Sequence, residues 1–268
     1  MPDQSTAIVA APPPHLYTER VEAVRHYTDT LFAFVCERPP ALRFRSGEFV
    51  MIGLMGGSKP LLRAYSIASP AWDDQLTFYS IKAPNGPLTS RLQNIQRGDQ
   101  VLIGKKPTGT LVLDALTPGR RLFLLSTGTG VAPFASLVRE PETYERYEEV
   151  ILTHTCRTGR ELEFSREAVA AALADPLVGE AARTKLRHVS SVTRESFGLE
   201  GRITALIANG ALFSALKAPR FDPNTDRIMI CGSIPMLQDL KALAEAAGFV
   251  EGSNHEPGSF VVERAFAS

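Results

Sequence analysis

The pattern of hydrophobic and polar positions changes near residue 117. Before it, short apolar runs are separated by turns rich in glycine and proline, and Gln75–Lys82 alternates polar with apolar residues. Strands at this spacing predict a small antiparallel β-barrel. The predicted strands are Leu31–Cys36, Phe49–Leu54, Leu61–Ala68, Gln75–Lys82, Val101–Gly104 and Gly109–Leu113, with one short helix at Pro87–Ile95.

After Thr117-Pro118-Gly119, apolar strand patterns alternate with helical ones. This order predicts right-handed crossovers and a doubly wound parallel α/β sheet. We therefore expect a flexible arm at 1–16, a barrel domain at 17–117 and an α/β domain at 118–268. The predicted strands are Arg121–Ser126, Glu149–Thr155, Leu186–Val192, Arg227–Cys231 and Ser259–Phe266, and the predicted helices are Pro133–Arg139, Glu161–Ala174, Ile203–Leu216 and Ile234–Ala247.

Composition narrows the class of protein. Lys+Arg and Asp+Glu both number 29, so no overall charge favours nucleic acid or a membrane surface. The three cysteines are widely spaced, which disfavours a disulfide framework, a cysteine zinc site or an iron–sulfur cluster and suits a reducing cytoplasm. No apolar stretch approaches the ~20 residues of a membrane helix. We expect a cytoplasmic protein without a metal.

Polar residues interrupt the barrel strands at one place. Arg63–Ser66 puts Arg, Tyr and Ser within four residues of a strand, where each polar group needs a partner. An anion and a flat aromatic ligand would satisfy them, although a polar outer face would explain this tetrapeptide alone. Tyr79–Lys82 follows on the next strand, and Gly86–Ser90 opens a helix, whose first N–H groups favour an anion.

A glycine turn follows the first strand of the α/β region. Gly128 and Gly130 stand between an apolar strand and a helix, the context of a phosphate-binding turn, but Pro133 occupies the third position of the usual dinucleotide fingerprint. A tight structural turn explains such a pair equally well. No acid ends the next strand, and Arg157, Arg194 and Arg202 lie near strand ends. Unless they are merely solvated, these arginines favour the 2′-phosphate of NADP over NAD.

Five motifs in order resemble the ferredoxin–NADP reductases, of the bacterial kind, from about Tyr17 to the end of the chain. The resemblance implies a FAD-binding barrel followed by an NADP-binding domain, with the flavin at their junction. The motifs are Arg63-Ala64-Tyr65-Ser66, Gly86-Pro87-Leu88-Thr89-Ser90, Thr127-Gly128-Thr129-Gly130-Val131-Ala132-Pro133-Phe134, Cys231-Gly232-Ser233 and Phe260-Val261-Val262-Glu263-Arg264-Ala265-Phe266.

The resemblance also implies the site. Ser66 would lie near the reactive edge of the flavin, Cys231 beside the nicotinamide, and Glu263 would support proton and charge changes. Ala265 stands where plant-type relatives end on an aromatic residue, so we expect a short tail over the flavin, with Phe266 near the adenine. The implied cofactor-binding residues are Arg63, Ala64, Tyr65, Ser66, Tyr79, Ser80, Ile81, Lys82, Leu88, Thr89, Ser90, Thr127, Gly128, Thr129, Gly130, Arg157, Thr193, Arg194, Arg202, Gly232, Ser233, Asp239, Ala265 and Phe266.

The predicted activity is therefore electron transfer between NADP(H) and an acidic redox protein, ferredoxin or flavodoxin, bound transiently by a monomer. Arg43, Arg45, Lys105 and Lys106 are candidates for a basic docking rim. Three alternatives stay open: the reductase component of an oxygenase system, a free-flavin reductase and a non-catalytic flavin or nucleotide sensor. His154 and His188 lie in apolar strands and are expected to be core residues.

Overall fold

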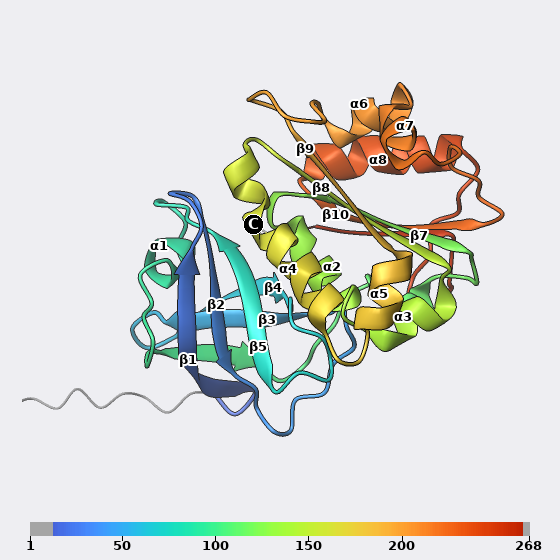
Figure 1. Ribbon diagram of the computed structural model, residues 1–268. Helices are drawn as coiled ribbons and strands as arrows, with labels where there is room; N and C mark the ends of the chain where they lie inside the picture. Colours follow the sequence, from blue (N-terminus) through green and yellow to red (C-terminus); the bar gives the residue numbers. More distant parts are fainter. Residues whose placement is uncertain (1–12, 265–268) are drawn as a thin grey trace, which may run out of the picture.

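The computed structural model describes residues 13–264, which form two sheets that lie side by side (Figure 1). The first is antiparallel, has the order β4-β3-β6-β1-β2-β5 and is barrel-like. Its interior holds a cluster of apolar side chains that includes Phe32, Phe34 and Phe78. Its elements are β1 (Leu16–His26), β2 (Leu31–Glu37), β3 (Phe49–Met55), β4 (Pro60–Ser66), β5 (Gln75–Ile81), α1 (Thr89–Leu92) and β6 (Gln100–Gly104).

The second sheet is parallel, with the order β11-β10-β7-β8-β9. Its strands are β7 (Arg121–Thr127), β8 (Glu149–Cys156), β9 (Leu186–Val192), β10 (Asp226–Gly232) and β11 (Phe260–Arg264). Its helices are α2 (Ala132–Leu137), α3 (Pro141–Arg146), α4 (Glu163–Ala174), α5 (Gly179–Lys185), α6 (Ile203–Ala208), α7 (Ala211–Leu216) and α8 (Ile234–Ala246), with the short 3-10 helices Leu113–Ala115, Gly128–Val131 and Gly159–Leu162.

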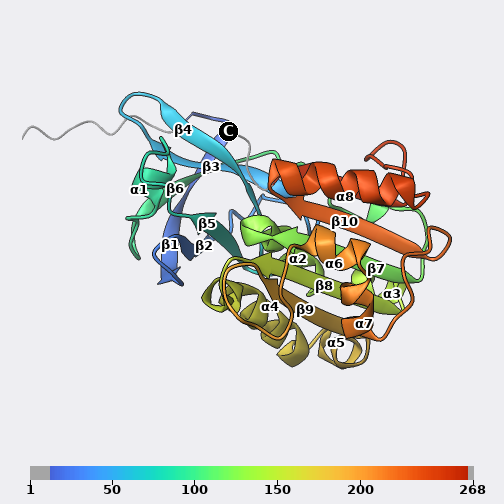
Figure 2. The same ribbon diagram turned by 90° about the horizontal axis from the view of Figure 1, so that it is seen from above.

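Helices cover both faces of the parallel sheet (Figures 1 and 2). Successive residues of a strand point to opposite faces. Leu122 and Leu124 accordingly join a core with α2 and α4, which lies next to the barrel, whereas Phe123 and Leu125 join a core with α6, α7 and α8. This two-faced burial explains why the middle of β7, residues 122–125, is a continuous apolar run, as the sequence pattern predicts for a doubly wound sheet.

Strand order reverses between β7 and β10, because the chain passes from β7 to β8 and β9 on one side and then crosses to β10 and β11 on the other. In doubly wound sheets, ligands bind outside the carboxyl ends of the strands at such a switch point. Here those ends carry the turn Thr127–Gly130 and the start of α8 at Ser233. The topology therefore points to this edge as the site.

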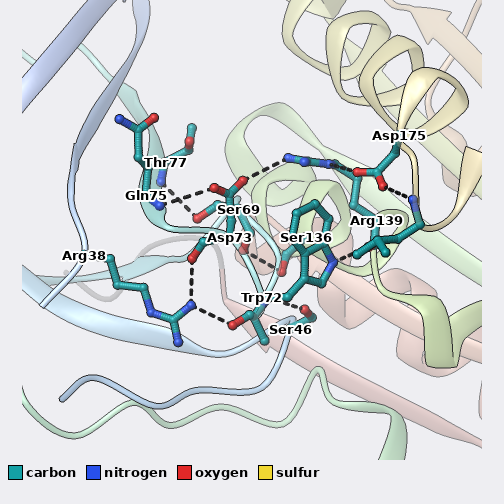
Figure 3. Close-up of polar contacts among 12 residues, drawn as sticks. Arg38, Ser46, Ser69, Trp72, Asp73, Gln75, Thr77, Ser136, Arg139 and Asp175 are labelled. Atoms are coloured by element: carbon teal, nitrogen blue, oxygen red, sulfur yellow. Dashed lines mark hydrogen bonds and ion pairs between the residues drawn. The ribbon is translucent and has the colours of Figure 1, made fainter. Parts of the chain in front are cut away.

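A network of polar contacts joins the two sheets on the side of the loop between β4 and β5 (Figure 3). Arg139 follows α2 and pairs with Asp73 of the barrel at 3.3 Å and with Asp175 of its own domain at 3.1 Å. The Trp72 indole N–H donates to the carbonyl oxygen of Arg139 at 2.9 Å, and the Ser136 hydroxyl donates to the carbonyl oxygen of Ser69 at 2.9 Å. These contacts hold the barrel against the α/β sheet.

A second set of contacts joins β1 and β5 to α4. The Tyr27 hydroxyl donates to Glu167 at 2.7 Å, and Arg25 forms an ion pair with the same carboxylate. The Tyr79 ring stacks on Phe164, with centroids 4.1 Å apart and planes inclined by 3°. One apolar cluster therefore includes side chains from both sheets.

Several predicted elements need correction. Gly109–Leu113 is not a strand: Gly109 has φ +143, and a 3-10 helix follows at Leu113–Ala115. The predicted helix Ile203–Leu216 is two helices, because Gly210 adopts φ +85 between α6 and α7. The helix expected at Pro87–Ile95 is regular only over Thr89–Leu92. The sequence pattern did not reveal β1, α3 or α5.

Three further expectations concern the described part of the chain. The free cysteines Cys36, Cys156 and Cys231 are all buried there, without disulfides. Between residues 13 and 264, no group of His, Cys, Asp or Glu side chains is arranged to hold a metal ion. No helix in this range has the length and apolar character needed to cross a membrane. Residues 1–12 of the arm predicted at 1–16, and the terminal positions Ala265 and Phe266, lie outside the described residues.

Candidate functional site

Two neighbouring cavities lie where the barrel meets the switch point, and Thr129 lines both. The smaller, which we call the barrel-side cavity, has a volume of about 120 Å³. It combines the strand β4 motif with the turn that opens α1, as the sequence predicts. Its lining residues are Arg63, Ala64, Tyr65, Ser66, Tyr79, Gly86, Pro87, Leu88, Thr89, Thr129 and Ala132.

Tyr65 is held by a buried hydrogen bond. The Ser80 hydroxyl donates to the carbonyl oxygen of Ile81 at 3.1 Å and therefore accepts from the Tyr65 hydroxyl at 2.9 Å. Ser80 is fully buried and lines neither cavity, so it orients Tyr65 from behind. The Thr89 hydroxyl is likewise engaged, since it donates to the carbonyl oxygen of Ala83 at 3.1 Å.

Two residues that line this cavity carry a buried hydroxyl without a partner. Within the described residues, neither the Tyr79 hydroxyl nor the Thr129 hydroxyl makes a hydrogen bond. Buried polar groups are normally paired, because an unpaired one costs about 1–3 kcal/mol. Arg63 donates one N–H to the carbonyl oxygen of Leu62, which leaves other guanidinium donors free for an anion. The barrel-side cavity therefore fits a ligand with polar atoms and negative charge.

The larger cavity, which we call the strand-end cavity, has a volume of about 610 Å³. It lies at the carboxyl ends of β7, β8, β9 and β10 and is closed on the barrel side by the end of β5. Its lining residues are Thr30, Leu31, Ile81, Lys82, Thr127, Gly128, Thr129, Thr155, Cys156, Arg157, Glu161, Thr193, Arg202, Ile203, Thr204, Ser233, Pro235, Met236 and Asp239.

The glycine turn between β7 and α2 needs both of its glycines. Gly128 has φ +54, a conformation that favours glycine, and no atom lies within 4 Å of the position a Cβ would take. A Cβ on Gly130 would lie 2.3 Å from the carbonyl oxygen of Cys231. The turn thus packs its backbone directly on the end of β10 and faces open space on its other side.

Arginines gather at the ends of β8 and β9. Arg157 and Arg202 line the strand-end cavity, and the N–H of Arg194 donates to the carbonyl oxygen of Arg157 at 3.0 Å. One acid, Glu161, lines the cavity in the turn that follows β8. Its carboxylate accepts a hydrogen bond from the backbone N–H of Arg157 at 2.8 Å. Because that carboxylate is used to cap the turn, the arginine side chains stay available for an anion.

Cys231 and Glu263 occupy paired positions on β10 and β11, behind the glycine turn. The N–H of Thr110 donates to the Glu263 carboxylate at 2.9 Å. Burial raises the pKa of Glu263 to about 7, against the opposing effect of this hydrogen bond and with a smaller contribution from Glu48. Burial also raises the pKa of the Cys231 thiol, so that this side chain stays neutral.

Glu263 should make stability depend on pH. The pKa of Glu263 is raised in the folded state, so the protonated carboxyl contributes to the free energy of unfolding. This contribution is fully present below the pKa of the unfolded chain, near 4.5, and is lost as pH rises through about 7. The unfolding free energy of the wild type should therefore fall by about 3 kcal/mol as pH rises over that interval. In Glu263→Gln, which has no carboxyl group at this position, this fall should be absent. Urea unfolding of both proteins at pH 5 and pH 8 measures it; parallel pH dependences would contradict the raised pKa.

The structure brings most predicted site residues to the two cavities. The strand-end cavity also has lining residues that were not predicted: Thr30, Leu31, Thr155, Cys156, Glu161, Ile203, Thr204, Pro235 and Met236. Of these, Glu161 had a readable signal in the sequence, its capping box with Thr158. The predicted residues that line neither cavity are Ser80, Ser90, Gly130, Arg194, Cys231, Gly232 and Glu263, and Ala265 and Phe266 lie outside the described residues.

A family model and several known proteins are similar to this chain. Residues 124–242 match the family model "Oxidoreductase NAD-binding domain". The chain is 56% identical over 249 residues to a flavodoxin/ferredoxin–NADP reductase of Rhodobacter capsulatus, with 92% of each chain covered. It is 54% identical to ferredoxin–NADP reductase A of Sorangium cellulosum, covering 94% of this chain and 91% of the relative.

A solved structure is similar over the whole fold. The ferredoxin NADP+ reductase of Neisseria gonorrhoeae, determined with bound FAD and NADP, superposes with a TM-score of 0.85 at 30% identity. The alignment covers 95% of this chain and all of that one. Both the barrel and the parallel sheet are therefore shared.

Proposed function

The chain belongs to the ferredoxin–NADP reductases, and we propose that it moves electrons between NADP(H) and ferredoxin through bound FAD. When bound, FAD exchanges a hydride with the nicotinamide and single electrons with the protein partner. The observation that carries this proposal is the meeting of the two cavities at Thr129, whose buried hydroxyl has no partner within the described residues.

The barrel-side cavity would bind the flavin nucleotide. Arg63 and the turn before α1 would hold its diphosphate, Tyr65 would pack on the ring, and Ser66 would donate to the ring edge. The raised pKa of Glu263 lets a carboxyl behind the glycine turn keep or release a proton near neutral pH. Ala265 and Phe266 keep their proposed place over the flavin, and we divide the two domains at about residue 117.

The strand-end cavity would bind NADP(H), with Arg157 and Arg202 at the 2′-phosphate and Thr193 and Arg194 beside them. Support comes from the arginines at the ends of β8 and β9 and from the engaged carboxylate of Glu161. Ser233 precedes the first residue of α8, Asp239 lies within this helix, and both line the cavity. They would contact the remainder of the dinucleotide.

This assignment predicts coenzyme preference. We expect Arg157→Ala and Arg202→Ala each to raise KM for NADPH about tenfold or more, because each loses a charge-assisted hydrogen bond. KM for NADH should hardly change. Steady-state kinetics with both coenzymes measures this, with Arg183→Ala as control, since Arg183 lies on α5 and bonds to the carbonyl oxygen of Leu173. Equal losses with both coenzymes would exclude 2′-phosphate recognition.

For the protein partner, we propose transient docking of acidic ferredoxin or flavodoxin to a monomer. Of the four predicted rim cations, Arg45 pairs with Glu48 at 3.0 Å and Asp114 at 3.7 Å, which lessens its attraction for an acid. Lys105 lies over the Tyr17 ring at 4.9 Å. We propose a cytoplasmic location from the three unpaired cysteines.

The visible spectrum of the purified protein tests the central proposal. A yellow protein that keeps FAD through gel filtration and bleaches on anaerobic addition of NADPH is expected. A colourless protein that FAD does not reconstitute would overturn the proposal. A yellow protein that NADPH leaves unchanged would favour a flavin sensor instead. The reductase component of an oxygenase would be recognised by rapid reduction of an oxygenase iron–sulfur protein and none of ferredoxin.

A further inference from the structure

His154 lies on β8 under the glycine turn, and its side chain is fully buried. Its Nε2 is 2.8 Å from the carbonyl oxygen of Gly128, and its Nδ1 is 2.8 Å from the Ser165 hydroxyl. Because a carbonyl oxygen can only accept, Nε2 carries a proton and donates to Gly128, while the Ser165 hydroxyl donates to the carbonyl oxygen of Leu162 at 2.8 Å. The contact with the Gly128 carbonyl requires a proton on Nε2.

The ring carries no charge at neutral pH. Burial lowers the pKa of His154 to about 4, and His188 acts in the same direction, while the bond to Gly128 opposes them. The Cys156 sulfur lies 3.2 Å from Nε2, and burial raises the pKa of this thiol to about 12. The cluster is therefore neutral, and its effect on the turn is geometric.

That geometry reaches the site through one peptide plane. In a trans peptide, the carbonyl and the following N–H point in opposite directions. A Gly128 carbonyl held toward His154 therefore turns the N–H of Thr129 away from β8. Gly128 at φ +54 has no side chain of its own to resist rotation of this plane. The hydrogen bond from the His154 imidazole restrains this rotation instead.

We propose that His154 is a positioning residue that fixes the Gly128–Thr129 peptide in the orientation that binds the dinucleotide; this rests on the proposed function. His154 lines neither cavity and acts through the turn, which lines both.

Variants separate positioning from packing. We expect His154→Leu in the FAD-loaded protein to bind NADP+ about tenfold more weakly, because the Gly128 carbonyl loses its donor. His154→Gln keeps one N–H donor and should bind nearly as well as the wild type. Calorimetric titration with NADP+ measures the three dissociation constants.

Thr153→Val is the matched control. It removes a buried hydroxyl from the neighbouring position of the same strand, 3.4 Å from the carbonyl oxygen of Leu124 and remote from the turn. Its NADP+ affinity should be unchanged. A leucine variant that binds like this control, or a glutamine variant as weak as the leucine one, would overturn the proposal.

The imidazole ¹⁵N shifts of the wild type give a readout that needs no variant and no turnover. We expect the Nε2–H tautomer, and an Nδ1–H tautomer would contradict the role. A wild type that binds no NADP+ would overturn the proposed function, and this inference with it. Normal wild-type binding beside an unaffected leucine variant would overturn the inference alone.

Discussion

Replacing Gly130 by alanine is expected to slow NADPH-driven flavin reduction at least about a hundredfold, the cost of misplacing reacting groups by about 1 Å. The added Cβ would lie 2.3 Å from the carbonyl oxygen of Cys231 and 2.9 Å from the nitrogen of Gly232. Because β10 is paired on both sides, by β7 and β11, the turn must move instead. Stopped-flow absorbance with NADPH measures the rate.

Two other glycines serve as controls for Gly130→Ala. Gly198 has no atom within 4 Å of a Cβ position and no positive φ, so Gly198→Ala should leave the rate unchanged. Gly128 has equal space but φ +54, so Gly128→Ala tests backbone strain without a clash with β10. A Gly130→Ala protein that reduces its flavin at the wild-type rate would show that close packing on β10 does not set the site.

Replacing Arg139 by alanine is expected to lower the free energy of unfolding by about 3–5 kcal/mol, the usual cost of removing one partner from a buried ion pair. The Asp175 side chain is only 1% exposed and would lose its ion-pair partner. Asp73 would lose its partner across the junction, and the cation at 4.9 Å from the Trp72 ring would be gone (Figure 3). Urea unfolding measures the change.

Arg120→Ala is the control for that experiment. Arg120 also pairs with an acid, Glu148, but both side chains are about two-thirds exposed, so solvent screens the pair and its loss should matter little. Arg139→Lys keeps the positive charge but lacks the planar guanidinium that bridges two carboxylates. Its free energy of unfolding should lie between those of the wild type and Arg139→Ala. Equal stabilities for Arg139→Ala and Arg120→Ala would exclude a structural role for the junction contacts.

The amino-acid pattern determined the fold class because burial follows it locally. The continuous apolar run in β7 reflects two cores, one on each face, and the spacing of strands and turns before residue 117 reflects a barrel. The pattern was a poorer guide to elements that form only by pairing with segments elsewhere in the chain. β1 is largely polar and is a strand because β2 and β6 pair with it. Gly109, predicted to begin a strand, instead packs against Glu263.

The same division holds for the candidate site. Residue types at Arg63–Ser66 and Thr127–Gly130 predicted an anion-binding, nucleotide-binding edge, and Arg63–Ser66 and Thr127–Thr129 line the cavities. Tertiary structure alone decided that Ser80 supports Tyr65 from behind and that His154 holds the turn. The physical reason is that a motif specifies chemical groups, whereas the face a side chain occupies and the partner it meets depend on packing between segments far apart in the chain.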